Sequence, residues 1–184
     1  MKCPSCTNGE LNRAYLDNLF ACQTCDHCGG NWILLEHYLR WKDTSPEPLD
    51  AASAEDLDIE PMDSKQALVC PVSGALMLKY RISKDSSHRL DLSPDVGGIW
   101  LDKGEWEYLK KAGLAHQLNS IFTTPWQRKV RSESAKDTFE QMYRKKFGNE
   151  DYEKVKSVRA WLVAHPHRNA LRAFLMAEDP WSAS

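Results

Sequence analysis

The sequence lacks the features of a membrane protein, a secreted protein or a common enzyme class. No stretch approaches the roughly 20 consecutive apolar residues of a membrane-spanning helix. Met1-Lys2-Cys3 leads into the chain without the apolar core of a signal peptide, so we expect a cytoplasmic protein. No phosphate-cradling glycine loop and no nucleophilic set of serine, histidine and aspartate is visible. The sequence therefore predicts that the protein is not an enzyme.

Charge is nearly balanced overall but unevenly distributed. The 184 residues carry 24 Lys and Arg against 26 Asp and Glu, and 42% of the residues are apolar. Residues 1–123 hold 12 basic against 18 acidic side chains, whereas residues 124–177 hold 12 against 6. This length can form one or two small domains, and the C-terminal part is the basic one.

Four of the six cysteines form two Cys-x-x-Cys pairs near the start of the chain. Eighteen residues separate the pairs, a spacing typical of a four-cysteine zinc ribbon. Such a site surrounds Zn²⁺ with thiolates and leaves no position for water or substrate, which indicates a structural metal. Disulfides are disfavoured because clustered cysteines in a cytosolic chain more often bind metal. We predict one zinc ion per chain, with Cys3, Cys6, Cys25 and Cys28 as ligands.

Cys22 provides an alternative second pair, because Cys22 and Cys25 are also separated by two residues. Gly29 and Gly30 favour the pair that ends at Cys28, since the backbone after a knuckle's second cysteine often needs positive φ. Cys22 is then expected to be a half-buried thiol. A thiol beside zinc thiolates could also take part in redox sensing, which remains a further alternative.

The chain contains an internal repeat. Gly29-Gly30-Asn31-Trp32 recurs 68 residues later as Gly97-Gly98-Ile99-Trp100, and Cys3-Pro4 recurs 67 residues later as Cys70-Pro71. A nearly constant offset across two separate motifs indicates a duplicated unit. The second copy retains Cys70, but three other ligand positions have changed, to Ser73, Ser93 and Val96. We therefore expect this copy to be held by packing and to bind no metal.

The succession Cys-Pro-x-Cys, hairpin, Cys-x-x-Cys-Gly-Gly-x-Trp resembles the TFIIB-type zinc-ribbon family of small, mainly bacterial proteins. Residues 97–105 are similar to that family's Trp-Leu-Asp-x-Gly-Glu tail, although the ligands of this copy are missing. The resemblance covers about residues 1–41 and 68–112. It implies metal binding and a ribbon fold, but not a role in transcription.

Residues 42–66 have the composition of a linker. Three prolines interrupt this stretch, and eight acidic residues oppose two lysines. Such a segment cannot bury a core, so we expect it to be solvated. The alternative is that it docks on the basic C-terminal region.

Capping patterns predict helices in the remainder of the chain. Asp102, Thr124 and Asn149 are the expected N-cap residues, and Gly113 and Gly148 follow two of the expected C-termini. The expected helices cover residues 102–111, 124–147, 150–164 and 167–177. The last two have apolar faces and should pack as a helical hairpin.

The helix over 124–147 is the candidate nucleic-acid surface. Positive charge interleaved with aromatics such as Phe139 and Tyr143 suits a phosphate backbone with stacked bases. The simpler interpretation, which we favour, is a solvated helix whose aromatics pack inward, because acidic residues are interspersed. The candidate contacts are Arg128, Lys129, Arg131, Arg144, Lys145 and Lys146.

The sequence thus predicts an α+β protein with two tandem zinc-ribbon-like β units, the first with zinc and the second metal-free, followed by a C-terminal helical segment. The expected divisions are 1–41, 42–66, 67–114 and 115–184. The expected function is a non-enzymatic zinc-binding module that recognises a protein or an assembly. Nucleic-acid binding, in transcription or on the ribosome, is the alternative, and a thiol redox sensor is the third interpretation.

Overall fold

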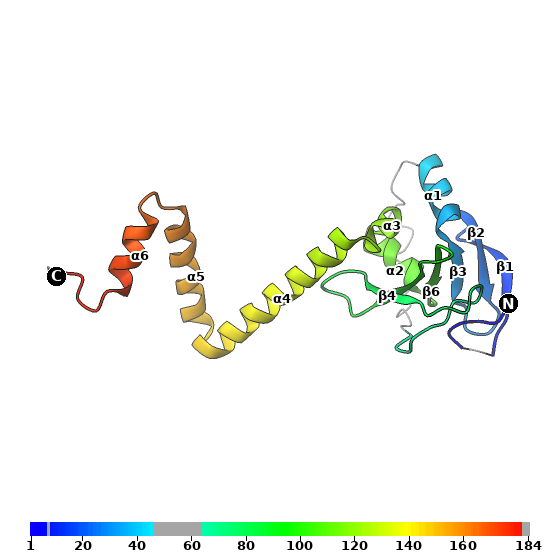
Figure 1. Cartoon of the computed structure of the whole chain (residues 1–184), viewed down its shortest axis with the longest axis horizontal. Helices are drawn as coiled ribbons and strands as arrows, with labels where there is room; N and C mark the ends of the chain where they lie inside the picture. Colours follow the sequence, from blue (N-terminus) through cyan, green and yellow to red (C-terminus); the bar gives the residue numbers. More distant parts are fainter. Residues whose placement is uncertain (7, 46–63, 182–184) are drawn as a thin grey trace. The chain divides into compact units, whose positions relative to one another are not determined.

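The computed structural model describes residues 1–6, 8–45 and 64–181 (Figure 1). The expected docking of the acidic linker falls largely on residues 46–63, which lie outside the described residues. The chain divides into two compact units, Met1–Glu133 and Ser134–Ser184. The strands are β1 (Leu11–Leu16), β2 (Phe20–Cys25), β3 (Asn31–Leu34), β4 (Leu78–Arg81), β5 (Arg89–Ser93) and β6 (Gly98–Leu101). The helices are α1 (Leu35–Thr44), α2 (Glu105–Lys111), the 3₁₀ turn η2 (Ala115–Gln117), α3 (Leu118–Ile121), α4 (Thr124–Phe147), α5 (Asn149–Ala164) and α6 (Arg168–Met176).

A single six-stranded antiparallel sheet forms the frame of the first unit, in the order β1-β2-β3-β6-β5-β4. Strands β1 to β3 come from the first predicted ribbon segment, and β4 to β6 come from the second. The two segments meet at the centre of the sheet, where β3 pairs with β6 and Trp32 lies opposite Trp100. The two predicted segments therefore share one sheet.

The glycines of the repeated motif make room for the tryptophan of the other segment. A Cβ atom at Gly30 would lie 2.2 Å from Cζ2 of Trp100, and one at Gly98 would lie 2.0 Å from Cζ2 of Trp32. Both tryptophan side chains are buried. The contact is reciprocal: the glycine of each Gly-x-Trp motif leaves a space, and the tryptophan of the other motif fills it.

Backbone pairing near the two knuckles also corresponds between the segments. The amide of Leu11 donates to the carbonyl of Met1 at 2.7 Å, and the amide of Met77 donates to that of Leu68 at 2.9 Å. Isolated bridges join Lys2 to Glu10 and Val69 to Leu76. The amide of Cys3 donates to the carbonyl of Gly9, and the amide of Cys70 donates to the carbonyl of Ala75. The backbone of residues 68–77 therefore follows that of residues 1–11 closely.

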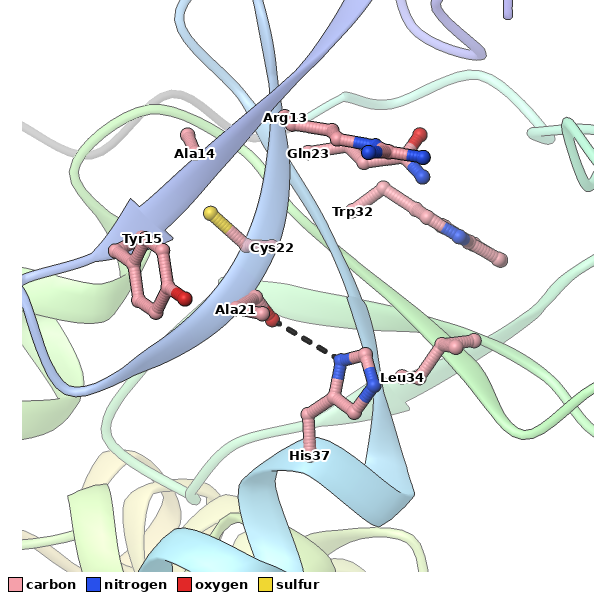
Figure 2. A pocket seen from close by; sticks show the side chains of 9 residues that line it. All are labelled: Arg13, Ala14, Tyr15, Ala21, Cys22, Gln23, Trp32, Leu34 and His37. Carbon is pink, nitrogen blue, oxygen red and sulfur yellow. Dashed lines mark hydrogen bonds between the residues drawn. The ribbon is translucent and has the colours of Figure 1, made fainter.

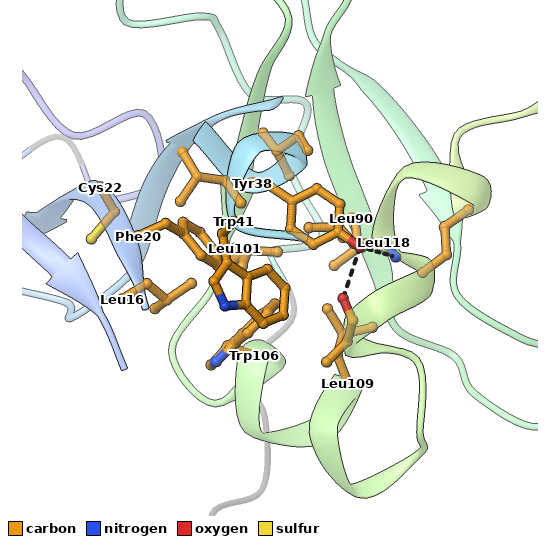
Figure 3. Close-up of a cluster of buried hydrophobic side chains, with 14 of the residues drawn as sticks. Leu16, Phe20, Cys22, Tyr38, Trp41, Leu90, Leu101, Trp106, Leu109 and Leu118 are labelled. Atoms are coloured by element: carbon orange, nitrogen blue, oxygen red, sulfur yellow. Dashed lines mark hydrogen bonds between the residues drawn. The ribbon is translucent and has the colours of Figure 1, made fainter. Parts of the chain in front are cut away.

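One face of the sheet packs on helices α1, α2 and α3 and holds the larger core (Figure 3). Sheet side chains alternate between faces, so Phe20, Ile33 and Ile99 point to this side and meet Trp41 of α1 and Trp106 of α2. The aromatic rings contact each other at centroid distances of 5.4–6.0 Å. This layer holds α1, from the first segment, and α2, from the second, on the same sheet face.

Two polar contacts join elements that are distant in sequence. The buried hydroxyl of Tyr38 donates to the carbonyl of Ala115 at 2.9 Å and accepts from the amide of Leu118 at 3.2 Å. Burial raises the pKa of Tyr38 to about 12. The buried ammonium of Lys110 pairs at 2.5 Å with Asp17, in the turn between β1 and β2. These contacts fix the helices over the N-terminal hairpin.

The helices occupy the predicted ranges, but their caps differ from the prediction. The helix at 102–111 begins only at Glu105, after Gly104 at φ +90°, while the Glu105 carboxylate accepts from the amide of Asp102 as expected of a capping partner. Thr123, one residue before the predicted cap, accepts a hydrogen bond from the amide of Trp126. Gly148 precedes α5, and no side chain caps that helix. The carboxylate of Asp102 bonds to Trp100 and Ser64 instead of to its own helix. The capping hydroxyl of α4 belongs to Thr123 and not to Thr124.

The C-terminal unit is helical, and the predicted α+β class is confirmed. Helices α5 and α6 contact each other as predicted, but their apolar faces remain largely exposed, including Val155, Trp161 and Phe174. No residue of either helix is buried. Across the described parts of the chain, no helix combines the length and apolarity needed to cross a membrane.

Candidate metal centre

The four predicted zinc ligands lie together at one end of the N-terminal hairpin. Cys3 and Cys6 stand on the turn that precedes β1, Cys25 ends β2, and Cys28 lies in the turn before β3. Their sulfur atoms all lie within 4.8 Å of one another. The sulfurs of Cys3 and Cys28 are 3.6 Å apart, as are those of Cys6 and Cys25.

These separations fit a zinc ion. Four sulfurs at the usual Zn–S distance of about 2.3 Å form a tetrahedron whose edges are about 3.8 Å long. None of the six cysteines is in a disulfide, so all four thiols are available as ligands. The arrangement therefore provides a complete thiolate set for Zn²⁺ within a ribbon, without contribution from another side chain.

The backbone of the site is also shaped for thiolates. Amides donate toward sulfur from Cys6 to Cys3 at 3.5 Å and from Cys28 to Cys25 at 3.4 Å. Gly29 has φ +73°, as predicted for the residue after the second knuckle. A Cβ atom at Gly9 would lie 2.4 Å from the sulfur of Cys25, so this position accommodates only glycine without a shift. Amide donors stabilise the charge that develops on sulfur when metal binds.

The acidities of the thiols differ in the metal-free chain. Burial raises the pKa of Cys3 to about 11 and also raises that of Cys28. Burial opposes ionisation of Cys6 too, but hydrogen bonds with the backbone of Gly9 and Asn8 outweigh it and lower the pKa of Cys6 to about 6. Zinc must therefore displace protons from buried thiols, because only thiolates ligate the metal.

Cys22 lies outside the sulfur cluster. It is buried on the helix-covered face of the sheet, where its sulfur is 3.6 Å from the hydroxyl of Thr24 and 4.0 Å from Oδ1 of Asn31. Burial raises the pKa of Cys22. A buried thiol with little thiolate character is a poor redox sensor, so this geometry gives no support to the redox interpretation.

The corresponding positions of the second segment hold a hydrogen-bonded cluster. The amide of Ser73 donates to the sulfur of Cys70 at 3.4 Å, as the amide of Cys6 does to Cys3. The hydroxyl of Ser93 donates to Asp95. Burial opposes ionisation of Cys70, but hydrogen bonds with Ser73 and Ser93 lower its pKa. Among the described residues, the four N-terminal cysteines are the one group of ligating side chains close enough to share a metal.

The six predicted nucleic-acid contacts fall into two groups, one in each unit. Arg128, Lys129 and Arg131 are exposed near the start of α4. Lys145 and Lys146 are exposed near its end, but Arg144 is paired with Glu140 at 2.7 Å and with Glu153 at 2.5 Å. Ion pairing within the unit therefore compensates one of the three cations.

The aromatic residues of α4 behave differently from the favoured interpretation. Trp126 packs against the core, and its indole donates to the carbonyl of Ile82 at 3.0 Å. Phe139 and Tyr143, however, remain 58% and 41% exposed, so the expectation that the aromatics pack inward is wrong for these two. In a helix whose charged and apolar residues surround it on all sides, neither ring has a core to enter.

The sequence alone did not reveal a row of side chains on the sheet face opposite the helices. Across the first three strands, Arg13 pairs with Gln23, and Gln23 pairs with Trp32. At the centre of the sheet, Trp32 pairs with Trp100. The row continues from Trp100 to Asp91 and from Asp91 to Lys79. The available signal was the alternation of polar and apolar residues along the first hairpin, which predicts faces but not neighbours across strands.

Comparison with known families places the metal centre in a recognised type of domain. Residues 2–44 match the model of the TFIIB-type zinc-ribbon family, described as a transcription factor zinc-finger. This match confirms the resemblance of the N-terminal segment and spans the four cysteines, β1 to β3 and α1. Comparisons with curated proteins and with solved structures gave no match.

Proposed function

We propose that this chain is a non-enzymatic zinc-binding module whose metal is structural and whose role is to recognise a protein partner. The observation that carries the proposal is the closed set of four cysteine sulfurs within 4.8 Å of one another in a zinc ribbon. With four thiolates, zinc has its preferred coordination filled, and it stabilises the fold instead of activating water. One zinc per chain is proposed.

The metal would stabilise the part of the sheet where the chain has least core. The cluster around the knuckles is small and contains Leu11, Trp32 and Trp100 in addition to the cysteines. Small structural units commonly depend on a metal for part of their folding free energy. Loss of zinc is expected to disorder the two knuckles and the β1–β2 hairpin first. The core between the sheet and helices α1, α2 and α3 should remain folded.

We place the protein in a reducing compartment such as the cytoplasm. The support for this placement is the set of six free cysteines, four of which are shaped for metal. Reduced thiols remain available as ligands where glutathione and thioredoxin oppose disulfide formation.

The proposal is tested by comparing the zinc-loaded chain with Cys25→Ser and Cys22→Ser in two assays. Zinc content should fall to zero in Cys25→Ser and stay unchanged in Cys22→Ser. In quantitative affinity capture, the same proteins should be retained by the wild type and Cys22→Ser and be lost with Cys25→Ser. Equal retention by all three chains would contradict a zinc-supported recognition module.

Nucleic-acid binding remains a second candidate function, and the exposure of Phe139 and Tyr143 beside Lys145 and Lys146 favours it. Exposed rings with nearby cations are suited to stacking on bases of a single strand. The double variant Lys145→Glu/Lys146→Glu should weaken binding to a single-stranded oligonucleotide and flatten its salt dependence. Unchanged binding, or no binding by the wild type at low salt, would return this helix to a solvated surface.

A further inference from the structure

A groove of about 280 Å³ lies in the zinc-ribbon segment, lined by residues of β1, β2, β3 and α1. Arg13, Gln23, Trp32 and Leu34 project from β1, β2 and β3 to the same side and line part of this groove (Figure 2). His37, from α1, stands at the rim, with its Nδ1 3.3 Å from the carbonyl oxygen of Ala21. A groove of this size accommodates a few side chains of a ligand, at the lower limit of common binding sites.

On the other half of the same sheet face, the chain itself lies against the corresponding residues. The row that starts with Arg13, Gln23 and Trp32 continues through Trp100, Asp91 and Lys79, so these three are the counterparts in reverse order. Residues 64–68 lead along this second half into the bridge formed by Val69. Leu68 is buried in the cluster that contains Trp100.

The occupying segment is held through its backbone. The ammonium of Lys79 donates to the carbonyl of Ser64 at 2.5 Å, and the amide of Ser64 donates to Oδ2 of Asp102 at 2.6 Å. The other carboxylate oxygen of Asp102 accepts from the indole of Trp100 at 2.7 Å. Contacts to a main-chain N–H and C=O are the way in which a protein binds an extended peptide irrespective of its sequence.

The N-terminal groove differs from its counterpart in charge. Lys79 has an internal counter-ion, because its ammonium lies 2.8 Å from the carboxylate of Asp91, which is buried. Gln23 lies beside Arg13 at the position that corresponds to Asp91, and its side chain is neutral. Within the described residues, the side chain of Arg13 is exposed and its guanidinium makes no hydrogen bond or ion pair. The position of Asp102 corresponds to Leu34, which makes that end of the groove apolar.

We propose that this groove binds an extended segment of a partner protein that carries an acidic side chain next to an apolar one. The carboxylate supplies the counter-ion that Gln23 does not provide to Arg13, and the apolar side chain packs on the half-buried Leu34. The occupied half of the sheet provides the precedent for an extended chain in this position. This inference rests on the proposed recognition function and assigns it a surface and a class of partner.

The test selects phage-displayed linear heptapeptides on the zinc-loaded full chain and measures the resynthesised peptides by fluorescence polarisation. The selected sequences should be enriched in Asp or Glu beside an apolar residue. Arg13→Ala should weaken their binding about 10-fold or more, the loss expected for a charge-assisted hydrogen bond. Arg89→Ala, which removes an exposed cation of β5, should change it less than about twofold. Arg13→Glu should select basic peptides in place of acidic ones.

Three results would overturn the proposal: no enrichment over the Arg13→Glu chain, affinities that Arg13→Ala leaves unchanged, or Arg13-dependent self-association in native mass spectra. Zinc content is measured on every sample. A chain with one zinc but no Arg13-dependent peptide binding removes the groove and leaves the proposed function standing. A chain without zinc removes the proposed function itself. Chemical-shift changes confined to residues of β1, β2 and β3 would support the groove as the site of binding.

Discussion

The reciprocal contact between the glycines and tryptophans of the two segments predicts a large and specific cost for Gly30→Ala. The new Cβ atom would lie 2.2 Å from Cζ2 of Trp100, whereas ordinary contact begins near 3.4 Å, so atoms must move apart by about 1.2 Å. Trp100 is completely buried, so its ring has no solvent-facing side toward which it could move freely. Overpacking of a dense core costs about 1–3 kcal/mol, and we expect a value near 3 kcal/mol.

A double-mutant cycle separates this steric effect from other consequences of the substitution. Trp100→Phe removes the ring that carries Cζ2, so Gly30→Ala should cost less than about 1 kcal/mol in that background, a coupling energy of about 2 kcal/mol. Gly98→Ala with Trp32→Phe is the corresponding cycle, and Gly30→Ala with Trp32→Phe is the control with much smaller coupling. The assay is guanidinium denaturation of zinc-saturated protein followed by far-UV circular dichroism. A cost below about 0.5 kcal/mol for Gly30→Ala, or an equal cost in the Trp100→Phe background, would refute the reasoning.

Three further predictions concern the second segment, the metal and the core. The triple variant Ser73→Cys, Ser93→Cys and Val96→Cys should create a second zinc site, since the backbone there follows that of the first site. Native mass spectrometry should then detect two zinc ions per chain. A single zinc ion would contradict the structural correspondence of the two segments. Zinc affinity should decrease as pH falls, because protons compete for the thiolates, and competition with a chromogenic chelator tests this sign. The zinc-free chain should gain stability from about pH 6 to 9, where the lowered pKa of Cys6 favours its thiolate in the folded state, and lose stability above about pH 9, where the raised pKa of Cys3 keeps its thiol protonated only in the folded state; urea melts from pH 6 to 10 test both directions. Tyr38→Phe should lower the free energy of unfolding by about 1–3 kcal/mol, because the amide of Leu118 and the carbonyl of Ala115 lose the hydroxyl as a partner. An unchanged free energy of unfolding in denaturant melts would contradict this prediction.

The ligand set and the helices could be predicted because local sequence determines them. Two residues between cysteines form a knuckle, and Gly29 allows the positive φ that follows it. The helix over 124–147 is marked by Pro125 near its start and Gly148 at its end, and the structure agrees to within one residue. Exact caps were less predictable, because the carboxylate of Asp102 is bound by Trp100 and Ser64 instead of by its own helix.

The shared sheet and the groove could not be predicted because they depend on long-range strand pairing. The repeat indicated two similar units, but nothing in either motif specifies that β3 pairs with β6. Arg13, Gln23 and Trp32 become neighbours only through the register of three strands. Register is determined by the complete buried face, so single residues in the sequence carry little information about it.

The measurement that tests the central claim most directly is the zinc content of the full chain, determined by elemental analysis together with native mass spectrometry after purification without added metal. One tightly bound zinc per chain, lost when Cys25 or Cys28 is replaced by serine, is the predicted result. A chain purified without zinc whose knuckles and β1–β2 hairpin are nevertheless ordered, or one that retains its zinc in both serine variants, would contradict the structural zinc site.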